Sequence, residues 1–274
     1  MAEQEKWLEE HAGYENFGLS MEADTEAYAG HVKKARELTR KSVESALRDD
    51  SKENGAIWEE NEAVWEAAFG NVAEAKKAAA DGLKLYPTSQ GVEEEAALVY
   101  AMAGDVAHAE SMAQDLNKRF PLDTQVQALW LPAIRAQEAL DRKSAAVAIE
   151  DLQPASGPMA LAQIPFVVNL SCLYPTYTRG QAYLAAGQGK SAAREFQKIL
   201  EQSGLVWNCW TGALAKLGVA RANALEAKTE QGADADAARV RALAGYKDFL
   251  ASWKDADADT PVLKQAKSEY AKLQ

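Results

Sequence analysis

Matching glycines and prolines recur at a fixed distance in this chain, and this period limits its possible folds more than any other feature. Gly70 and Gly104 are 34 residues apart, and so are Pro87 and Pro121. Three segments align on these positions: 63–87, 97–121 and 180–200. A glycine ends a helix by adopting the left-handed backbone conformation, and a proline cannot continue one. The period therefore predicts a row of helical hairpins that bury their apolar faces against one another.

Small residues mark the expected contact between the two helices of each hairpin. An alanine follows each turn glycine after five residues, where a small side chain lets the second helix pack closely on the first. The aligned pairs are Gly70 with Ala75, Gly104 with Ala109, and Gly187 with Ala192.

Weaker copies of the unit lie in 27–47, 125–154 and 214–253. The first has Gly30 at its turn. In the second, Leu140 and Asp141 stand in the place of the turn glycine, and Ala145 follows in the second helix. The third has an expanded turn before Ala242.

The last segment, 260–274, predicts one further helix. Thr260 is suited to its N-cap and Pro261 to its first helical position. Because the segment is amphipathic and charged, we expect it to cap the end of an open stack.

The 34-residue helix-turn-helix unit resembles the tetratricopeptide repeat. The likeness covers most of the chain and is closest in the unit with Gly180, Tyr183, Gly187, Ala192 and Phe196. This resemblance implies a right-handed superhelix of paired helices with a concave binding surface.

Four segments are similar to the C-terminal repeat region of bacterial eukaryotic-like serine/threonine kinases: 23–47, 174–200, 212–222 and 246–274. In that family a kinase domain precedes the repeats, often with a membrane span between them. This chain has no glycine-rich kinase loop, H-R-D or D-F-G motif. The resemblance thus implies a sensor region with a kinase domain in cis, or a stand-alone relative. The first would lie in the periplasm if it follows a membrane span, and the second in the cytoplasm.

We therefore expect a single all-α domain over 1–274, a right-handed tetratricopeptide-like α-solenoid of about five to six repeats. Its expected parts are an N-terminal entry helix (1–26), repeats (27–152), a proline-rich insertion (153–175), the last two repeats (176–254) and a capping helix (260–274). The insertion and the expanded last turn depart from the usual family pattern.

Charge and composition argue against several kinds of partner. The net charge is −11, which disfavours nucleic acid, and we expect the basic stretch 31–41 to be a solvated helix face. No apolar run is long enough to span a membrane. The stretch 184–191 imitates a phosphate-binding loop, but Leu184 stands where the first glycine is required, so no nucleotide is expected.

Neither catalysis nor a cofactor is indicated. His11, His31 and His108 fall in different units and form no metal-binding or catalytic pattern. Cys172 and Cys209 are too few for a disulfide framework or a zinc site. We expect two buried thiols, with a single disulfide as the alternative.

The expected function is therefore that of a non-catalytic protein-binding module. A peptide or a partner's helix would lie in the concave groove, and exposed aromatic residues such as Trp130 and Tyr177 would anchor it. The alternative for these two rings is packing in the core. The groove candidates are Glu60, Glu94, Trp130, Tyr177, Gln181 and Asn223. In the alternative, the insertion 153–175 closes a pocket for a small ligand. If it does not, it is a packed surface loop.

Overall fold

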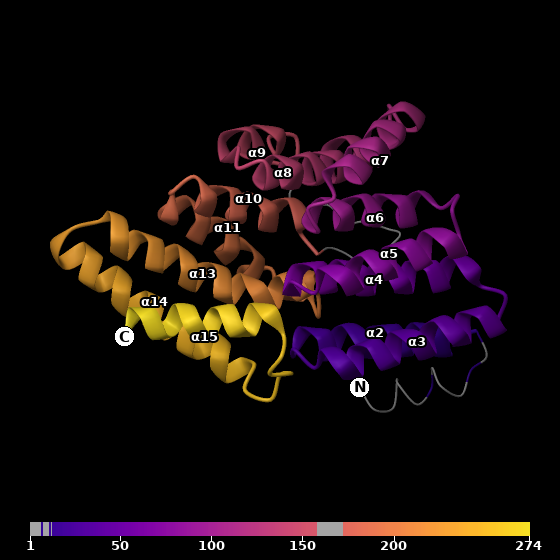
Figure 1. Cartoon of the computed structure of the whole chain (residues 1–274), viewed down its shortest axis with the longest axis horizontal. Coiled ribbons are helices and arrows are strands. Elements are labelled where there is room, and N and C mark those ends of the chain that lie inside the picture. The colour runs from indigo at the N-terminus through magenta and orange to yellow at the C-terminus, as the bar shows by residue number, and fades with distance from the viewer. Residues whose placement is uncertain (1–6, 8–10, 12, 158–171) are drawn as a thin grey trace.

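The computed structural model describes residues 7, 11, 13–157 and 172–274, and all regular secondary structure in them is helical. This confirms the all-α prediction. Consecutive helices pack as pairs (Figure 1). The pairs are α2 (Glu15–Tyr28) with α3 (Val32–Arg48), α4 (Lys52–Phe69) with α5 (Val72–Leu85), α6 (Gln90–Met102) with α7 (Val106–Arg119), α8 (Leu131–Asp141) with α9 (Ala145–Asp151), α10 (Tyr174–Ala185) with α11 (Gly189–Glu201), and α13 (Trp210–Thr229) with α14 (Gly232–Ser252).

Three shorter or terminal elements complete the described part of the chain. The π-helical turn η1 (Val126–Trp130) leads directly into α8, α12 (Ser203–Val206) precedes α13, and α15 (Pro261–Leu273) is the predicted last helix. None of the described helices is both long enough and apolar enough to cross a membrane.

The turn glycines behave as the period predicts. Gly30, Gly70, Gly104 and Gly187 have left-handed φ values of 83°, 89°, 71° and 75°. The alanines that follow them after five residues are fully buried; these are Ala35, Ala75, Ala109 and Ala192.

The fourth hairpin differs in register from the prediction. Lys143, rather than Leu140 or Asp141, takes the left-handed conformation, with φ 59°. Ala148, five residues further on, is fully buried, whereas Ala145 is partly exposed. The left-handed residue stands two positions before the second helix, as Gly104 does in the third hairpin, and that backbone requirement sets the register even without glycine.

The prediction of an expanded turn in the last hairpin is wrong. Only Glu230 and Gln231 join α13 to α14, which are 20 and 21 residues long. The additional residues lengthen both helices instead. They are rich in alanine, which favours helix, and they contain no proline.

The stack is not open, because its two ends pack against each other. Helix α13 contacts α2, and α15 contacts α4. The Trp253 indole N–H donates to the Tyr28 carbonyl (3.0 Å), and the Asp257 N–H donates to the Gly30 carbonyl (3.0 Å). The segment between α14 and α15 thus joins the last hairpin to the first, and α15 packs on the second hairpin rather than capping a free end.

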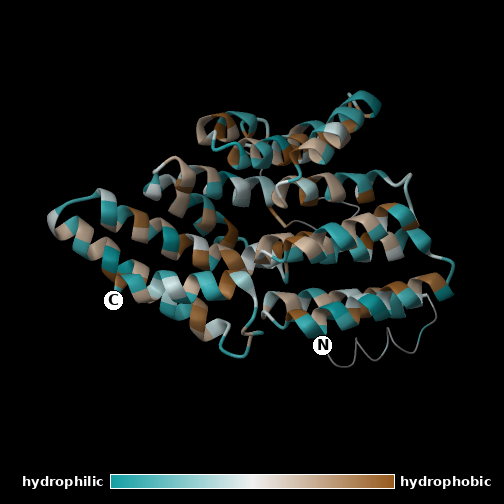
Figure 2. Cartoon of the chain, in the orientation of Figure 1, coloured by the Kyte–Doolittle hydropathy of each residue, from teal (hydrophilic) through white to brown (hydrophobic). Residues whose placement is uncertain are grey.

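The first helices of the hairpins consequently form a closed ring. Each of α2, α4, α6, α8, α10 and α13 contacts the next, and α13 returns to α2. The ring explains the aromatic core, in which the Phe69 and Trp253 rings from opposite ends of the chain meet edge to face with centroids 5.2 Å apart. Buried apolar residues from the hairpins form this core, and Figure 2 shows that apolar and polar residues alternate along the helices that supply them.

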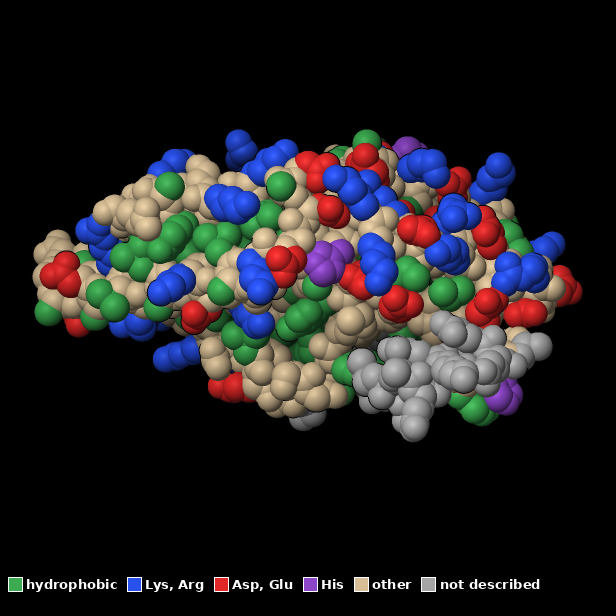
Figure 3. Space-filling model, turned by 90° about the horizontal axis from the view of Figure 1, so that it is seen from below, with side chains coloured by type: hydrophobic (Ala, Val, Ile, Leu, Met, Phe, Trp, Pro, Cys, Tyr) green, Lys and Arg blue, Asp and Glu red, His purple; other side chains and the backbone are tan. Residues whose placement is uncertain are grey.

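The basic stretch 31–41 lies on α3, and acidic partners neutralise it. Lys33 pairs with Asp259 (3.3 Å), Lys34 with Glu26 (2.5 Å), and Arg36 with the buried Glu66. Acidic and basic side chains lie close together over the face seen in Figure 3. This part of the surface is therefore a mosaic of ion pairs rather than a basic patch.

Candidate ligand-binding site

The six groove candidates lie mostly inside the molecule. Five of them are buried: Glu60, Glu94, Trp130, Tyr177 and Asn223; Gln181 is partly exposed. Trp130 and Tyr177 follow the alternative of core packing rather than groove exposure, since their side chains are 1% and 6% exposed. Their rings pack against Tyr174 and Trp210 (centroids 5.7 and 4.9 Å apart), because closure of the ring turns the concave side into the core.

The polar candidates have structural surroundings of their own. Burial raises the pKa of Glu94 to about 8, although the Gln90 amide donates to its carboxylate (2.8 Å). Burial also raises the pKa of Glu60 well above its usual value, with Glu95 and Glu59 adding to the effect. Asn223 accepts a hydrogen bond from Arg241 (2.8 Å).

A cleft of about 410 Å³ lies where the insertion leaves and rejoins the helices. One wall comes from the described ends of the insertion: Gln153, Ser156, Gly157 and Leu173. The other walls come from α10 and α11: Thr176, Arg179, Tyr183, Glu195, Lys198, Glu201 and Gln202. The sequence places these three segments far apart, and the fold brings them together.

The cleft exists because α9 is short. Helices α5 and α7 have 14 residues each, whereas α9 has 7. Pro154 lacks a backbone N–H and disfavours helix in the residue before it, so the chain leaves the helical path near this point. The end of α9 therefore leaves a part of the α10–α11 hairpin that α9 itself does not cover.

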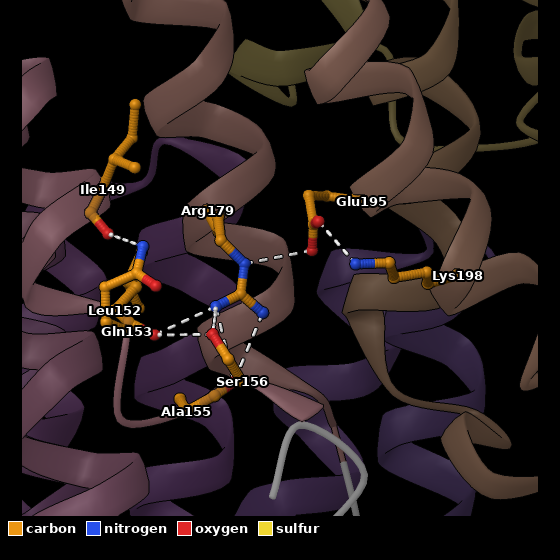
Figure 4. Close-up of polar contacts among 8 residues, drawn as sticks. All are labelled: Ile149, Leu152, Gln153, Ala155, Ser156, Arg179, Glu195 and Lys198. Atoms are coloured by element: carbon orange, nitrogen blue, oxygen red, sulfur yellow. Dashed lines mark hydrogen bonds and ion pairs between the residues drawn. The ribbon is translucent and has the colours of Figure 1, made fainter. Parts of the chain in front are cut away.

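Arg179 fastens the chain that follows α9 (Figure 4). Its guanidinium donates to the Leu152 carbonyl (3.0 Å), the Ala155 carbonyl (3.3 and 3.4 Å) and the Ser156 hydroxyl (3.2 Å). Its Nε donates to the Glu195 carboxylate (3.1 Å). Arg179 is buried, so this one side chain holds the chain after α9 by its carbonyls, although the Leu152 carbonyl also accepts from the Ala155 N–H (3.2 Å).

The charges that line the inner part of the cleft are balanced within the protein. Glu195 accepts from Arg179 and also from Lys198 (2.6 Å), as Figure 4 shows. The remaining polar groups there are mostly uncharged. The Thr176 hydroxyl oxygen is buried without a hydrogen-bond partner in the described structure. The arrangement offers hydrogen-bonding groups and apolar surface but little net charge.

Sequence reasoning did not identify Thr176, Arg179 or Glu195. The first two and Tyr183 are spaced three and four residues apart, so they share one face of α10. An arginine between apolar residues on such a face was the available signal, because a buried guanidinium requires several acceptors.

A second, smaller cavity lies inside the ring, next to the cleft. Its lining includes Asn61 and Trp65 of α4, Trp210 of α13, and Cys172 with Tyr174. The space open to the centre of a water molecule is about 10 Å³, which is room for one water. Burial raises the pKa of the Tyr174 hydroxyl, and the nearby Glu95 and Asp24 raise it further.

Cys172 and Cys209 form a disulfide, with Cα atoms 5.4 Å apart. The expectation of two thiols is thus wrong, and the alternative of a single disulfide is correct. The pairing depends on the way α10 and α13 bring two distant chain segments together, which no local pattern indicates.

Comparison with known proteins adds no relative, because neither a protein-family model nor a curated protein matches this chain. In the part of the chain that the structure describes, no group of three or more His, Cys, Asp or Glu residues is placed to hold a metal ion.

Proposed function

We propose that this chain is a non-catalytic binding module that takes a small uncharged ligand in the cleft between the insertion ends and the α10–α11 hairpin. The observation that carries this proposal is that both described ends of the insertion 153–175 line the same cleft. The volume of the cleft is within the range of small-molecule sites.

The class of ligand follows from the charges of the cleft. Because Arg179, Glu195 and Lys198 satisfy one another, a charged ligand would have to break an ion pair that is partly buried. Gln153 and Gln202 instead offer amide groups and Tyr183 offers apolar surface, while Thr176 and Leu173 are buried in the wall, with the Thr176 hydroxyl unpaired. A molecule with hydroxyl or amide groups and an apolar part matches both.

The proposal includes the finer architecture expected from the sequence. The left-handed turn glycines and the buried alanines support a tetratricopeptide-like, right-handed solenoid of about five to six repeats. The resemblance also predicts that this chain is the sensor region of a signalling kinase and that its repeats bind a peptide. Both of these remain predictions.

Titration of the whole chain with two uncharged probes tests the proposal. One probe is the capped amide N-acetyl-leucinamide and the other is maltose. Backbone NMR shifts induced by at least one probe should be confined to residues 153–157, 173–183 and 195–202. Shifts elsewhere, or none with either probe, contradict the assignment.

A matched pair of variants tests the contact itself. Thr176→Val removes the unpaired hydroxyl without changing the shape of the side chain, and it should weaken binding by up to about tenfold. Thr211→Val removes another buried, unpaired hydroxyl that does not line the cleft, and it should leave the dissociation constant unchanged.

A further inference from the structure

Three consecutive residues separate the cleft from the interior cavity. Leu173 lines the cleft, whereas its neighbours Cys172 and Tyr174 line the cavity. The disulfide joins this partition to Cys209, which lines the cavity from the segment before α13. The position of the partition therefore depends on one covalent bond.

Backbone strain is concentrated beside that bond. In the described residues, positive φ in a non-glycine residue occurs at Asp50, Lys143, Leu173 and Trp207. Asp50 and Lys143 lie in exposed turns between helices. Leu173 (φ 50°) directly follows Cys172, and Trp207 (φ 56°) stands two residues before Cys209.

Bulky side chains rarely adopt this conformation, so Leu173 and Trp207 are genuine outliers. Such residues persist only where the surrounding structure holds them, and they gather at sites that switch. The disulfide is the covalent restraint common to both.

The cavity behind the partition holds donors that lack partners. The indole N–H groups of Trp65 and Trp210 and the amide nitrogen of Asn61 are buried without hydrogen bonds in the described structure. The Trp210 indole stacks on Tyr174 (5.9 Å between centroids) without reaching hydrogen-bond geometry with a protein group. These donors suit the carbonyl or hydroxyl oxygen of a ligand, but the present space admits only one water.

We propose that the Cys172–Cys209 disulfide is a reducible gate that separates the ligand cleft from the interior cavity. A dithiol reductant breaks the bond through a mixed disulfide, supplies two electrons and two protons, and becomes a disulfide itself, leaving two thiols on the chain. Leu173 then relaxes from its left-handed conformation, and the cavity becomes continuous with the cleft. This proposal rests on the proposed function, because it extends the same binding site.

Both cysteines are buried, so the reductant reaches the sulfurs only when this segment opens locally. Slow reduction makes the gate respond to sustained reducing conditions rather than to brief ones. Trp207, two residues before Cys209, is half exposed, so the reductant approaches the disulfide from the Cys209 side.

Hydrogen exchange of the tryptophan indole N–H groups with water tests the gate without any ligand. The ¹⁵N-labelled chain is compared in its oxidised form, after reduction by dithiothreitol, and as the Cys172→Ser/Cys209→Ser variant. Opening should accelerate exchange at Trp65 and Trp210 by tenfold or more in the last two states.

Two other buried tryptophans are internal controls. The Trp58 indole donates to Asn16 (3.0 Å) and that of Trp253 donates to the Tyr28 carbonyl (3.0 Å), and neither residue lines the cavity. Their exchange should stay within twofold. Unchanged exchange at Trp65 and Trp210 overturns the gate, and so does equal acceleration at all four positions, which is a general loosening of the fold.

The two proposals can fail separately. If indole exchange accelerates at Trp65 and Trp210 as expected but neither probe binds the oxidised or reduced chain, the gate is supported and the ligand assignment is wrong. If a probe binds the cleft with the same dissociation constant and the same indole exchange in both redox states, the cleft stands and the gate falls. The reduced wild-type chain keeps the test decisive should the double serine variant fail to fold.

Discussion

The hairpins in α4–α7 and those in α8–α11 differ in how far the second helix of a hairpin covers its neighbours. In the first region two 14-residue second helices, α5 and α7, cover their neighbours along the full length. In the second region the 7-residue α9 stops early, and the buried Arg179 fastens the chain where a helix would otherwise continue. The candidate site lies where a hairpin is cut short, rather than along the inner face of the full-length hairpins.

The two regions also differ in how they bury charge. The α4–α7 region buries carboxyl groups without basic partners, and burial raises the pKa values of Glu60, Glu94 and Glu95. The α8–α11 region buries an ion pair between Arg179 and Glu195. The first arrangement makes stability depend on pH, and the second makes it depend on one side chain.

Removal of Arg179 should give the largest effect. Arg179→Met leaves the buried Glu195 carboxylate with only the half-exposed Lys198 as a partner and removes the side-chain donor to the Ala155 carbonyl, so we expect the free energy of unfolding to fall by about 3–5 kcal/mol. Urea denaturation measures this loss. Arg142→Ala, which breaks the exposed Arg142–Glu110 pair in the same region, should cost less than about 1 kcal/mol. Similar losses for both variants would mean that Arg179 does not replace the missing helix.

The α4–α7 region should give the main dependence on pH. The pKa of Glu94 is about 8 in the folded chain and near 4.5 when exposed, so the folded chain binds more protons between these values. Stability is therefore greatest below about pH 4.5 for this group and falls as pH rises to 8, by at most about 5 kcal/mol.

Glu94→Gln keeps the size of the side chain and removes one of the titrating groups, so it should reduce the slope of unfolding free energy against pH between 5 and 8, while Glu60 and Glu95 keep the rest of it. Glu53→Gln, on the exposed start of α4, is the control and should leave the slope unchanged. Because the other region buries a paired carboxylate, Arg179→Met should lower stability at every pH without removing the slope. A slope that Glu94→Gln leaves intact would place the proton uptake elsewhere.

The sequence was sufficient for features that depend on local backbone requirements. Gly70 and Gly104 mark turns because their φ values are positive, and Ala75 and Ala109 mark contacts because nothing larger fits there. Ring closure could not be predicted this way, since it depends on contacts such as Phe69 with Trp253, which lie in segments with no shared pattern. An open stack and an exposed Trp130 were the consequences of missing it.

The candidate site was only outlined by the sequence. The prolines identified the insertion 153–175, and a ligand pocket at that insertion was the stated alternative. Arg179, Thr176 and Glu195 were missed because their roles depend on how early α9 ends and on which carbonyls Arg179 contacts there. The disulfide was only the alternative to two thiols for the same reason, because it is a tertiary contact between two distant segments.

The smallest predicted effect exchanges a turn residue between the regions. Lys143 holds a left-handed φ of 59° in the turn where the third hairpin has Gly104, at φ 71°. A non-glycine residue pays about 1–2 kcal/mol for this conformation, and the greater freedom of glycine in the unfolded chain offsets about half of that. Lys143→Gly should therefore raise the free energy of unfolding by about 0.5–1 kcal/mol, and Gly104→Ala should lower it by a similar amount. Urea denaturation of the two variants gives opposite signs if both turns obey one backbone rule. A loss of stability in Lys143→Gly would instead show that the lysine side chain stabilises the shortened hairpin by contacts that outweigh the strain.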